Sequence, residues 1–160
     1  MIAPELWTMP SVLFLVALAG VVGMAAYTDV TQRRIPNWLC GVNLALGLAF
    51  AWVQAGWPGM GWAALHAVIA LLVTMGLFAA RVIGAGDAKF YASMAAWLPV
   101  TAGLRLLVSV ALAGLLLLIV FFAVRLRGRA NRPADRESPF AKLPYGVAIG
   151  IGGLVAVLAQ

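Results

Sequence analysis

A series of long apolar stretches, separated by short polar connections, constrains the fold of this chain more than any other feature. Each of five stretches is close to the roughly 20 residues that cross hydrocarbon as a helix. These stretches cover residues 9–27, 38–54, 61–80, 104–124 and 143–158. A sixth, residues 88–99, would be only about 18 Å long as a helix, so we expect it to start deeper in the membrane or to meet a locally thinned bilayer. The pattern predicts an all-α polytopic membrane protein with six transmembrane helices, of which the fourth is short.

Few of the 160 residues are charged. The charged fraction is 10% and the hydrophobic fraction is 64%, whereas soluble domains carry about 25% charged residues. This composition excludes an ordinary soluble protein, and we expect residues 1–160 to form a single membrane-embedded domain. The single cysteine, Cys40, excludes an internal disulfide and a multi-cysteine zinc site.

The basic residues predict how the chain is oriented. With six spans, one side of the membrane holds ten of the eleven Lys and Arg residues, so we expect that side to be cytoplasmic and both termini to lie outside. The ten residues are Arg33, Arg34, Arg81, Lys89, Arg125, Arg127, Arg129, Arg132, Arg136 and Lys142. The net charge of +6 therefore indicates membrane orientation and contact with anionic lipid rather than nucleic-acid binding. The sequence predicts no oligomeric state.

Five tryptophans are expected near the outer interface, because an indole is favoured at the level of the lipid headgroups. They are Trp7, Trp52, Trp57, Trp62 and Trp97.

Two of the five acidic residues fall at the predicted inner face of the membrane. Asp29 ends the first span, and Asp87 stands at the start of the short fourth one. A carboxylate at the membrane edge is costly when desolvated and by default indicates function. Two structural alternatives stay open: Asp29 could pair with Arg33, and Asp87 could cap a helix that begins at Ala88.

The residues around these acids favour a functional role. Asp29 is followed by the turn Arg34-Ile35-Pro36-Asn37, which should end one helix and start the next. Asp87 is preceded by Gly84-Ala85-Gly86, and the two glycines would let another segment approach closely. Two such turns on one face could bring both carboxylates together over an extended peptide.

These motifs resemble those of the type IV prepilin peptidases, which are membrane-embedded aspartic proteases of the Gly-x-Gly-Asp kind. That family carries an Asp followed by an Arg-Ile-Pro-Asn turn, and later Gly-x-Gly-Asp-x-Lys. The matching residues are Asp29, Arg34, Pro36, Asn37, Gly84, Gly86, Asp87 and Lys89. Pro144-Tyr145-Gly146 is similar to the family's late Pro-x-Gly segment, so the resemblance covers nearly the whole chain.

The resemblance implies that Asp29 and Asp87 are catalytic and need no metal or other cofactor. Two adjacent carboxyl groups share a proton, so one deprotonates a water while the other donates a hydrogen bond to the scissile carbonyl. The implied substrate is a prepilin with a short basic leader, a Gly at the cut and then an apolar helix. Cleavage would take place at the cytoplasmic face of the inner membrane.

The connection after the first span is short. Larger members of that family carry there a segment with Cys-x-x-Cys motifs and N-methyltransferase activity. In this chain the connection is only residues 28–37, so we do not expect methyltransferase activity. The short form resembles the stand-alone peptidases of Flp/Tad-type pilus systems.

Two other classes of protein remain as alternatives. A presenilin-type protease also uses Gly-x-Gly-Asp, but its Tyr-Asp pair and Pro-Ala-Leu motif are not matched here. A small proton-coupled transporter, or an assembly subunit, would use the acids to bind a cation or a partner helix without cleaving a peptide.

Several other polar residues each allow two interpretations. Lys89 could favour the charged carboxylate of Asp87 or extend to the inner headgroups. Gly84 and Gly86 could admit a substrate or only pack helices. His66 is expected to be a packed residue rather than a catalytic one.

Overall fold

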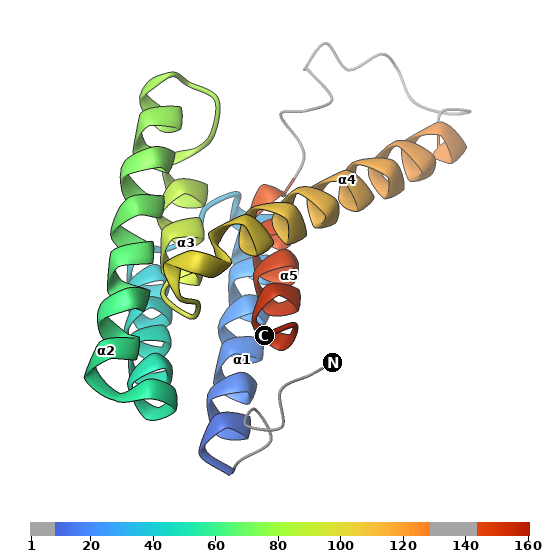
Figure 1. The fold of residues 1–160 in the computed structure, drawn as a ribbon. Helices are drawn as coiled ribbons and strands as arrows, with labels where there is room; N and C mark the ends of the chain where they lie inside the picture. The colour runs from blue at the N-terminus through green and yellow to red at the C-terminus, as the bar shows by residue number, and fades with distance from the viewer. Residues whose placement is uncertain (1–8, 129–143) are drawn as a thin grey trace.

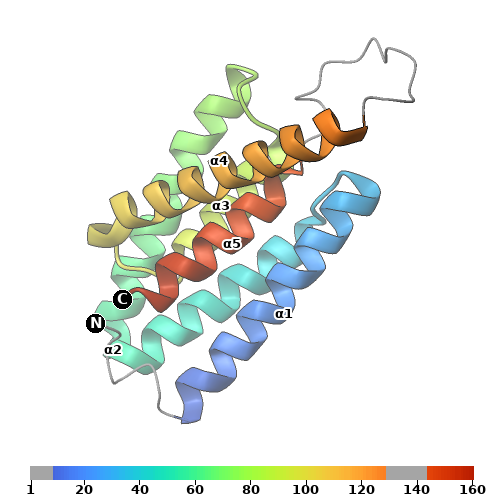
Figure 2. The ribbon, with the colours of Figure 1, turned by 90° about the vertical axis from the view of Figure 1, so that its right-hand side faces the viewer.

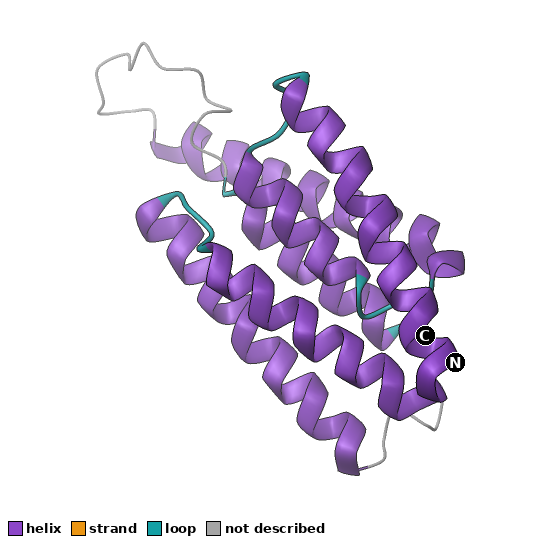
Figure 3. Cartoon of the chain, turned by 90° about the vertical axis from the view of Figure 1, so that its left-hand side faces the viewer, coloured by secondary structure: helices purple, strands orange, loops and turns teal. Residues whose placement is uncertain are grey.

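The computed structural model describes residues 9–128 and 144–160, and over that part of the chain every regular element is helical (Figure 1, Figure 3). The long helices are α1 (Met9–Gln32), α2 (Asn37–Ala79) and α4 (Gly103–Gly128). The short elements are α3 (Ala85–Ala95), the 3-10 turn η2 (Val100–Ala102) and α5 (Tyr145–Leu158). The predicted all-α fold is therefore confirmed.

Helix α2 is a hairpin of two helices rather than one straight rod. Ala55 and Gly56 have non-helical backbone angles, and φ of Gly56 is 63°, a conformation that glycine adopts without steric cost. Pro58 follows within the first turn of the second half, where its missing N–H is tolerated. The two halves, residues 37–54 and 57–79, correspond to the second and third predicted spans.

Three helices of the described chain are long and apolar enough to cross a membrane: Met9–Gln32, Asn37–Ala79 and Val100–Val124. This number takes the α2 hairpin as one helix and leaves out α3 and α5, which are shorter. Six spans and the outside location of both termini therefore stay predictions. Helix α3, which corresponds to the predicted short fourth span, begins at Ala85 instead of residue 88. It begins there because Gly84 has the extended conformation of an N-cap residue.

Helix α5 is central and packs against α1, α3 and α4 (Figure 2). Its glycines make these contacts close. A Cβ atom added to Gly150 would lie 2.8 Å from Val22 of α1, one on Gly152 would meet the backbone of Val110 in α4, and one on Gly153 would meet Met94 of α3. Small residues at a helix interface let neighbouring backbones approach, which favours association where lipid surrounds the bundle.

A buried hydrogen-bonded cluster joins α3 to the first half of α2. The Asn43 side-chain amide donates to Ser93 Oγ at 2.9 Å and to Met94 Sδ at 3.2 Å, and its oxygen accepts from Trp97 Nε1 at 3.1 Å. Asn43 has no exposed surface. Because α3 is short, this cluster fixes its depth and rotation against α2.

The prediction for Trp97 was wrong. Its side chain is 1% exposed, bonded to Asn43 and packed against Phe50 with a centroid distance of 5.4 Å, so it is an internal residue. Trp52, Trp57 and Trp62 are exposed, as an interfacial location requires. Trp7 lies outside the described residues.

Replacing Asn43 by alanine should destabilise the bundle. The Trp97 indole N–H would lose its buried acceptor, which costs about 1–3 kcal/mol. Thermal unfolding in detergent should show a lower Tm for Asn43→Ala than for Val42→Ala, whose side chain is exposed on the same helix turn. Equal Tm values for the two variants would show that the cluster does not hold α3.

Candidate functional site

The α1–α2 connection, the α2–α3 connection and the first turn of α5 all lie at one end of the molecule (Figure 1). Helix α1 ends because Arg33 takes a left-handed conformation, with φ of 53°, and its N–H donates to the Asp29 carbonyl at 3.0 Å. Asp29 therefore stands in the last turn of α1. The second half of α2 ends in the same way, at Arg81 with φ of 61°.

Asp29 is bound by the start of α5. The Gly146 N–H donates to Asp29 Oδ2 at 2.7 Å, and the carboxyl-bearing residue is 9% exposed. Free N–H groups at a helix N-terminus are suited to bind a carboxylate. The alternative of an Asp29–Arg33 ion pair is not seen among the described residues. The partner of Asp29 is instead a backbone group 117 positions later in the chain.

Asp87 lies in the first turn of α3, outside the three long apolar helices. Burial, and to a smaller extent the negative charge of Asp29, raises the pKa of Asp87 to about 6, while a backbone hydrogen bond from Gly84 acts in the opposite direction. Asp87 does not cap a helix that begins at Ala88, as the structural alternative had it. The helix begins at Ala85 with Gly84 as its N-cap, and the side chain of Asp87, the third helical residue, accepts a hydrogen bond from the Gly84 backbone. The two acids are thus close enough for one charge to affect the other.

The turn at residues 34–37 packs between the two acidic segments. Ile35 is 7% exposed, and a Cβ on Gly86 would lie 3.6 Å from its backbone nitrogen. A Cβ on Gly146 would lie 2.7 Å from Ile35 Cδ1. Ile35 was read only as part of a motif, and the structure makes it the apolar contact shared by the glycine segments on either side.

The remaining motif residues have different surroundings. Lys89 Nζ donates to Asn37 Oδ1 at 3.0 Å, so it links the two motifs, a role that neither interpretation of Lys89 had included. Pro36 and Pro144 are the N-cap residues of α2 and α5, where no helical N–H is needed. Arg34 is exposed, with no polar contact found in the described chain.

The Gly84 position is restricted by Asp87 itself. A Cβ there would lie 3.0 Å from Asp87 Oδ2. The glycine therefore leaves room for the carboxyl group of the acid that follows it.

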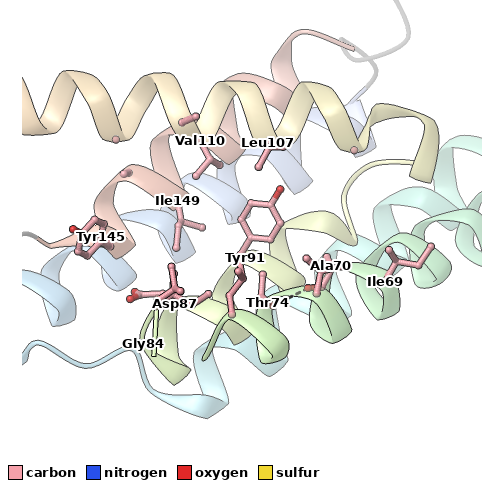
Figure 4. A pocket seen from close by; sticks show the side chains of 18 of the residues that line it. Ile69, Ala70, Thr74, Gly84, Asp87, Tyr91, Leu107, Val110, Tyr145 and Ile149 are labelled. Atoms are coloured by element: carbon pink, nitrogen blue, oxygen red, sulfur yellow. Dashed lines mark hydrogen bonds between the residues drawn. The ribbon is translucent and has the colours of Figure 1, made fainter. Parts of the chain in front are cut away.

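A cavity of about 1040 Å³ opens beside Asp87, between the second half of α2 and α4, with α3 and α5 as its floor (Figure 4). Its walls are mostly aliphatic. Tyr91 and Tyr145 also line it near Asp87. Tyr91 was not among the site residues predicted from the sequence, although a residue four positions after Asp87 on a helix shares its face.

His66 also reaches this cavity, at the far end from Asp87. It is 4% exposed and its Nδ1 lies 3.0 Å from the Leu98 carbonyl oxygen, so it is a packed residue as predicted. No group of three or more His, Cys, Asp or Glu side chains that could hold a metal ion is found in residues 9–128 and 144–160.

Replacing Gly146 by alanine should lower stability. The added Cβ would lie 2.8 Å from Asp29 Oδ2 and 2.7 Å from Ile35 Cδ1, so the hydrogen bond to Asp29 and the packing of Ile35 would both be disturbed. We expect a lower Tm in detergent, corresponding to a loss of about 1–3 kcal/mol.

The matched control is Gly23→Ala in α1, where an added Cβ would meet no atom within 4 Å. Alanine is the better helix former, so this variant should be at least as stable as the parent chain. If Gly146→Ala behaved like Gly23→Ala, the close contact of α5 with Asp29 would be refuted.

Comparison with known proteins identifies one family. A sequence model described as the type IV leader peptidase family matches residues 9–124. The matched range includes both acids, the turn at 34–37 and the Gly84–Lys89 segment, whereas Pro144 and Gly146 lie beyond it. No curated protein and no solved structure was found to match the chain.

Proposed function

The chain belongs to the type IV leader peptidase family, and on that premise we propose that it is an aspartic endopeptidase in which Asp29 and Asp87 form the catalytic pair. The observation that carries the proposal is that both acids lie within the matched range and, although 58 residues apart in the chain, are close enough for the charge of Asp29 to affect the ionisation of Asp87. The apolar helices and the family together indicate a membrane protein.

The proposed chemistry needs only the two carboxyl groups and water. Two carboxyl groups that interact cannot easily both ionise, so they share one proton. The ionised member takes a proton from water, which attacks the scissile carbonyl carbon, while the protonated member donates a hydrogen bond to the carbonyl oxygen. Because the pair titrates as a unit, the proton is not assigned to either residue.

The proposed substrate is an Flp-like prepilin whose short basic leader is removed at the cytoplasmic face of the inner membrane. Peptide bonds inside a helix are shielded by their own hydrogen bonds, so the bond to be cut must lie in a locally extended segment. A glycine at that point lowers the cost of unwinding. The position of both acids at the helix ends, rather than in the middle of the bundle, supports cleavage at a membrane edge.

Asp29→Asn and Asp87→Asn should each abolish prepilin processing. The amide keeps the size and polarity of the side chain but can neither share the proton nor act as a base. The double variant should be no worse than either single one, because residues that act as a unit lose function non-additively. Co-expression with an Flp-type prepilin, scored by gel shift and by the N-terminal sequence of the product, measures this.

Asp135→Asn, in the predicted basic loop, is the matched control and should process normally. All variants must first be shown to reach equal levels in the membrane. Substantial processing by either Asp29→Asn or Asp87→Asn would exclude the catalytic pair. Ion flux that requires Asp29 and Asp87 but is not accompanied by peptide cleavage would favour the transporter alternative instead.

The orientation can be tested with single cysteines in a Cys40→Ala background. We expect a cysteine at Arg132 to be protected from a membrane-impermeant maleimide in intact cells, and a cysteine at Trp57 to be labelled, because the basic loops should face the cytoplasm. Labelling of position 132 from outside would reverse the topology and remove the route of a cytoplasmic leader to the acids.

A further inference from the structure

The second half of α2 and helix α4 enclose an apolar groove that begins at Asp87. Helix α4 packs on α5 and slopes away from α2, which leaves the space between them open (Figure 1). On α2 the groove follows one helix face from Leu77 to His66. These residues are eleven positions apart, which corresponds to about 16 Å at about 1.5 Å per residue. We call this space the α2–α4 groove.

The walls of the α2–α4 groove are shaped for a helix. Small residues line it on both sides, with aliphatic residues such as Leu107 between them. The small residues are Ala70 on α2 and Gly103, Ala111 and Gly114 on α4. Within lipid, helices associate through close packing of small residues rather than through the hydrophobic effect. An apolar helix about three turns long would fill the groove.

The Tyr91 hydroxyl indicates a peptide rather than a lipid chain as the occupant of the groove. The Tyr91 hydroxyl has no hydrogen bond to any described residue, and it points toward α4 across the groove (Figure 4). Deeper in the groove, by contrast, Thr74 Oγ1 donates to the Ala70 carbonyl at 2.7 Å and His66 bonds to Leu98. An acyl chain has no acceptor to offer Tyr91, whereas an unwound peptide has free carbonyl groups that need a donor.

Resting on the proposed function, we propose that the α2–α4 groove holds the apolar helix of the substrate, and that Tyr91 donates a hydrogen bond to its unwound main chain next to the scissile bond. Asp87 and Tyr91 are one helical turn apart on the same face of α3. A substrate that lies along the groove therefore meets Tyr91 between its helical part and the carboxyl pair. Tyr91 is a positioning residue in this scheme, and the walls of the groove select an apolar helix.

Cross-linking tests the position of the substrate independently of cleavage. In a Cys40→Ala, Asp87→Asn background, a cysteine at Leu107, in the groove, should form a disulfide with a cysteine in the first three turns of the prepilin helix. Leu112, exposed on α4 and outside the groove, is the matched control and should not. Equal cross-linking at both positions, or none at Leu107, as expected if lipid fills the groove, would overturn the proposal.

Kinetics with two substrates separate the groove from the catalytic pair. Gly114→Leu would fill the groove, where the nearest atom to an added Cβ is Ala148 Cβ at 3.8 Å. It should lower kcat/KM for the intact prepilin about tenfold or more, and change that for a truncated substrate without the apolar helix by less than about twofold. Gly20→Leu, on a part of α1 with no neighbour within 4 Å, should change neither.

Tyr91→Phe should raise KM about threefold to tenfold for both substrates and leave kcat nearly unchanged, because it removes one hydrogen bond that is present before the reaction. An unchanged KM would exclude this role for Tyr91, and equal losses for both substrates with Gly114→Leu would exclude the groove. If the parent protein cleaves neither substrate, the proposed function itself fails, which is a different result from these.

Discussion

The hydrogen bond from the Gly146 N–H to Asp29 is the contact on which the arrangement of the site depends. It joins the last turn of α1 to the first turn of α5, at a distance of 2.7 Å. A buried carboxyl group without a donor is costly, and more so where the surroundings are apolar. The bond requires a glycine, since a Cβ there would lie 2.8 Å from the acceptor oxygen. The glycines that follow in α5 then allow α1, α3 and α4 to pack around it.

Helix α3 is the second part of this arrangement, because it carries both Asp87 and Tyr91. A helix of 11 residues has little surface with which to hold its position. Asn43 binds it near its C-terminal end through hydrogen bonds to Ser93 and Met94, with a third to Trp97 just after the helix, and Lys89 near its N-terminal end binds Asn37. These contacts set the height of Asp87 relative to Asp29, so residues far from the acids influence how the two carboxyl groups are placed relative to each other.

The two sides of the site are unequal. Toward α1 the site is closed by Ile35 and by the first turn of α5, whereas toward α4 it opens into the α2–α4 groove. A pair of acids beside an open groove suits the proposed enzyme, whose substrate would come from within the bilayer. The closed side is held by hydrogen bonds and close glycine contacts, whereas on the open side α4 is held mainly by its packing on α5.

The sequence by itself determined the all-helical fold, the hairpin within α2 as two apolar stretches, and the family, because these follow from local hydrophobicity and from short contiguous motifs. It did not determine which groups the individual side chains contact or form hydrogen bonds with. Trp97 is of a residue type common at membrane interfaces, but its indole N–H donates a hydrogen bond to Asn43 in the interior. Asp29 has Arg33 one turn away, but it accepts a hydrogen bond from the Gly146 N–H. Such choices depend on which helices lie side by side, which no local pattern specifies. The sequence also predicts six spans, the orientation and the roles of the two acids. Only the tertiary structure decided that there is an α2–α4 groove with Tyr91 in it, because a groove is formed by helices that diverge.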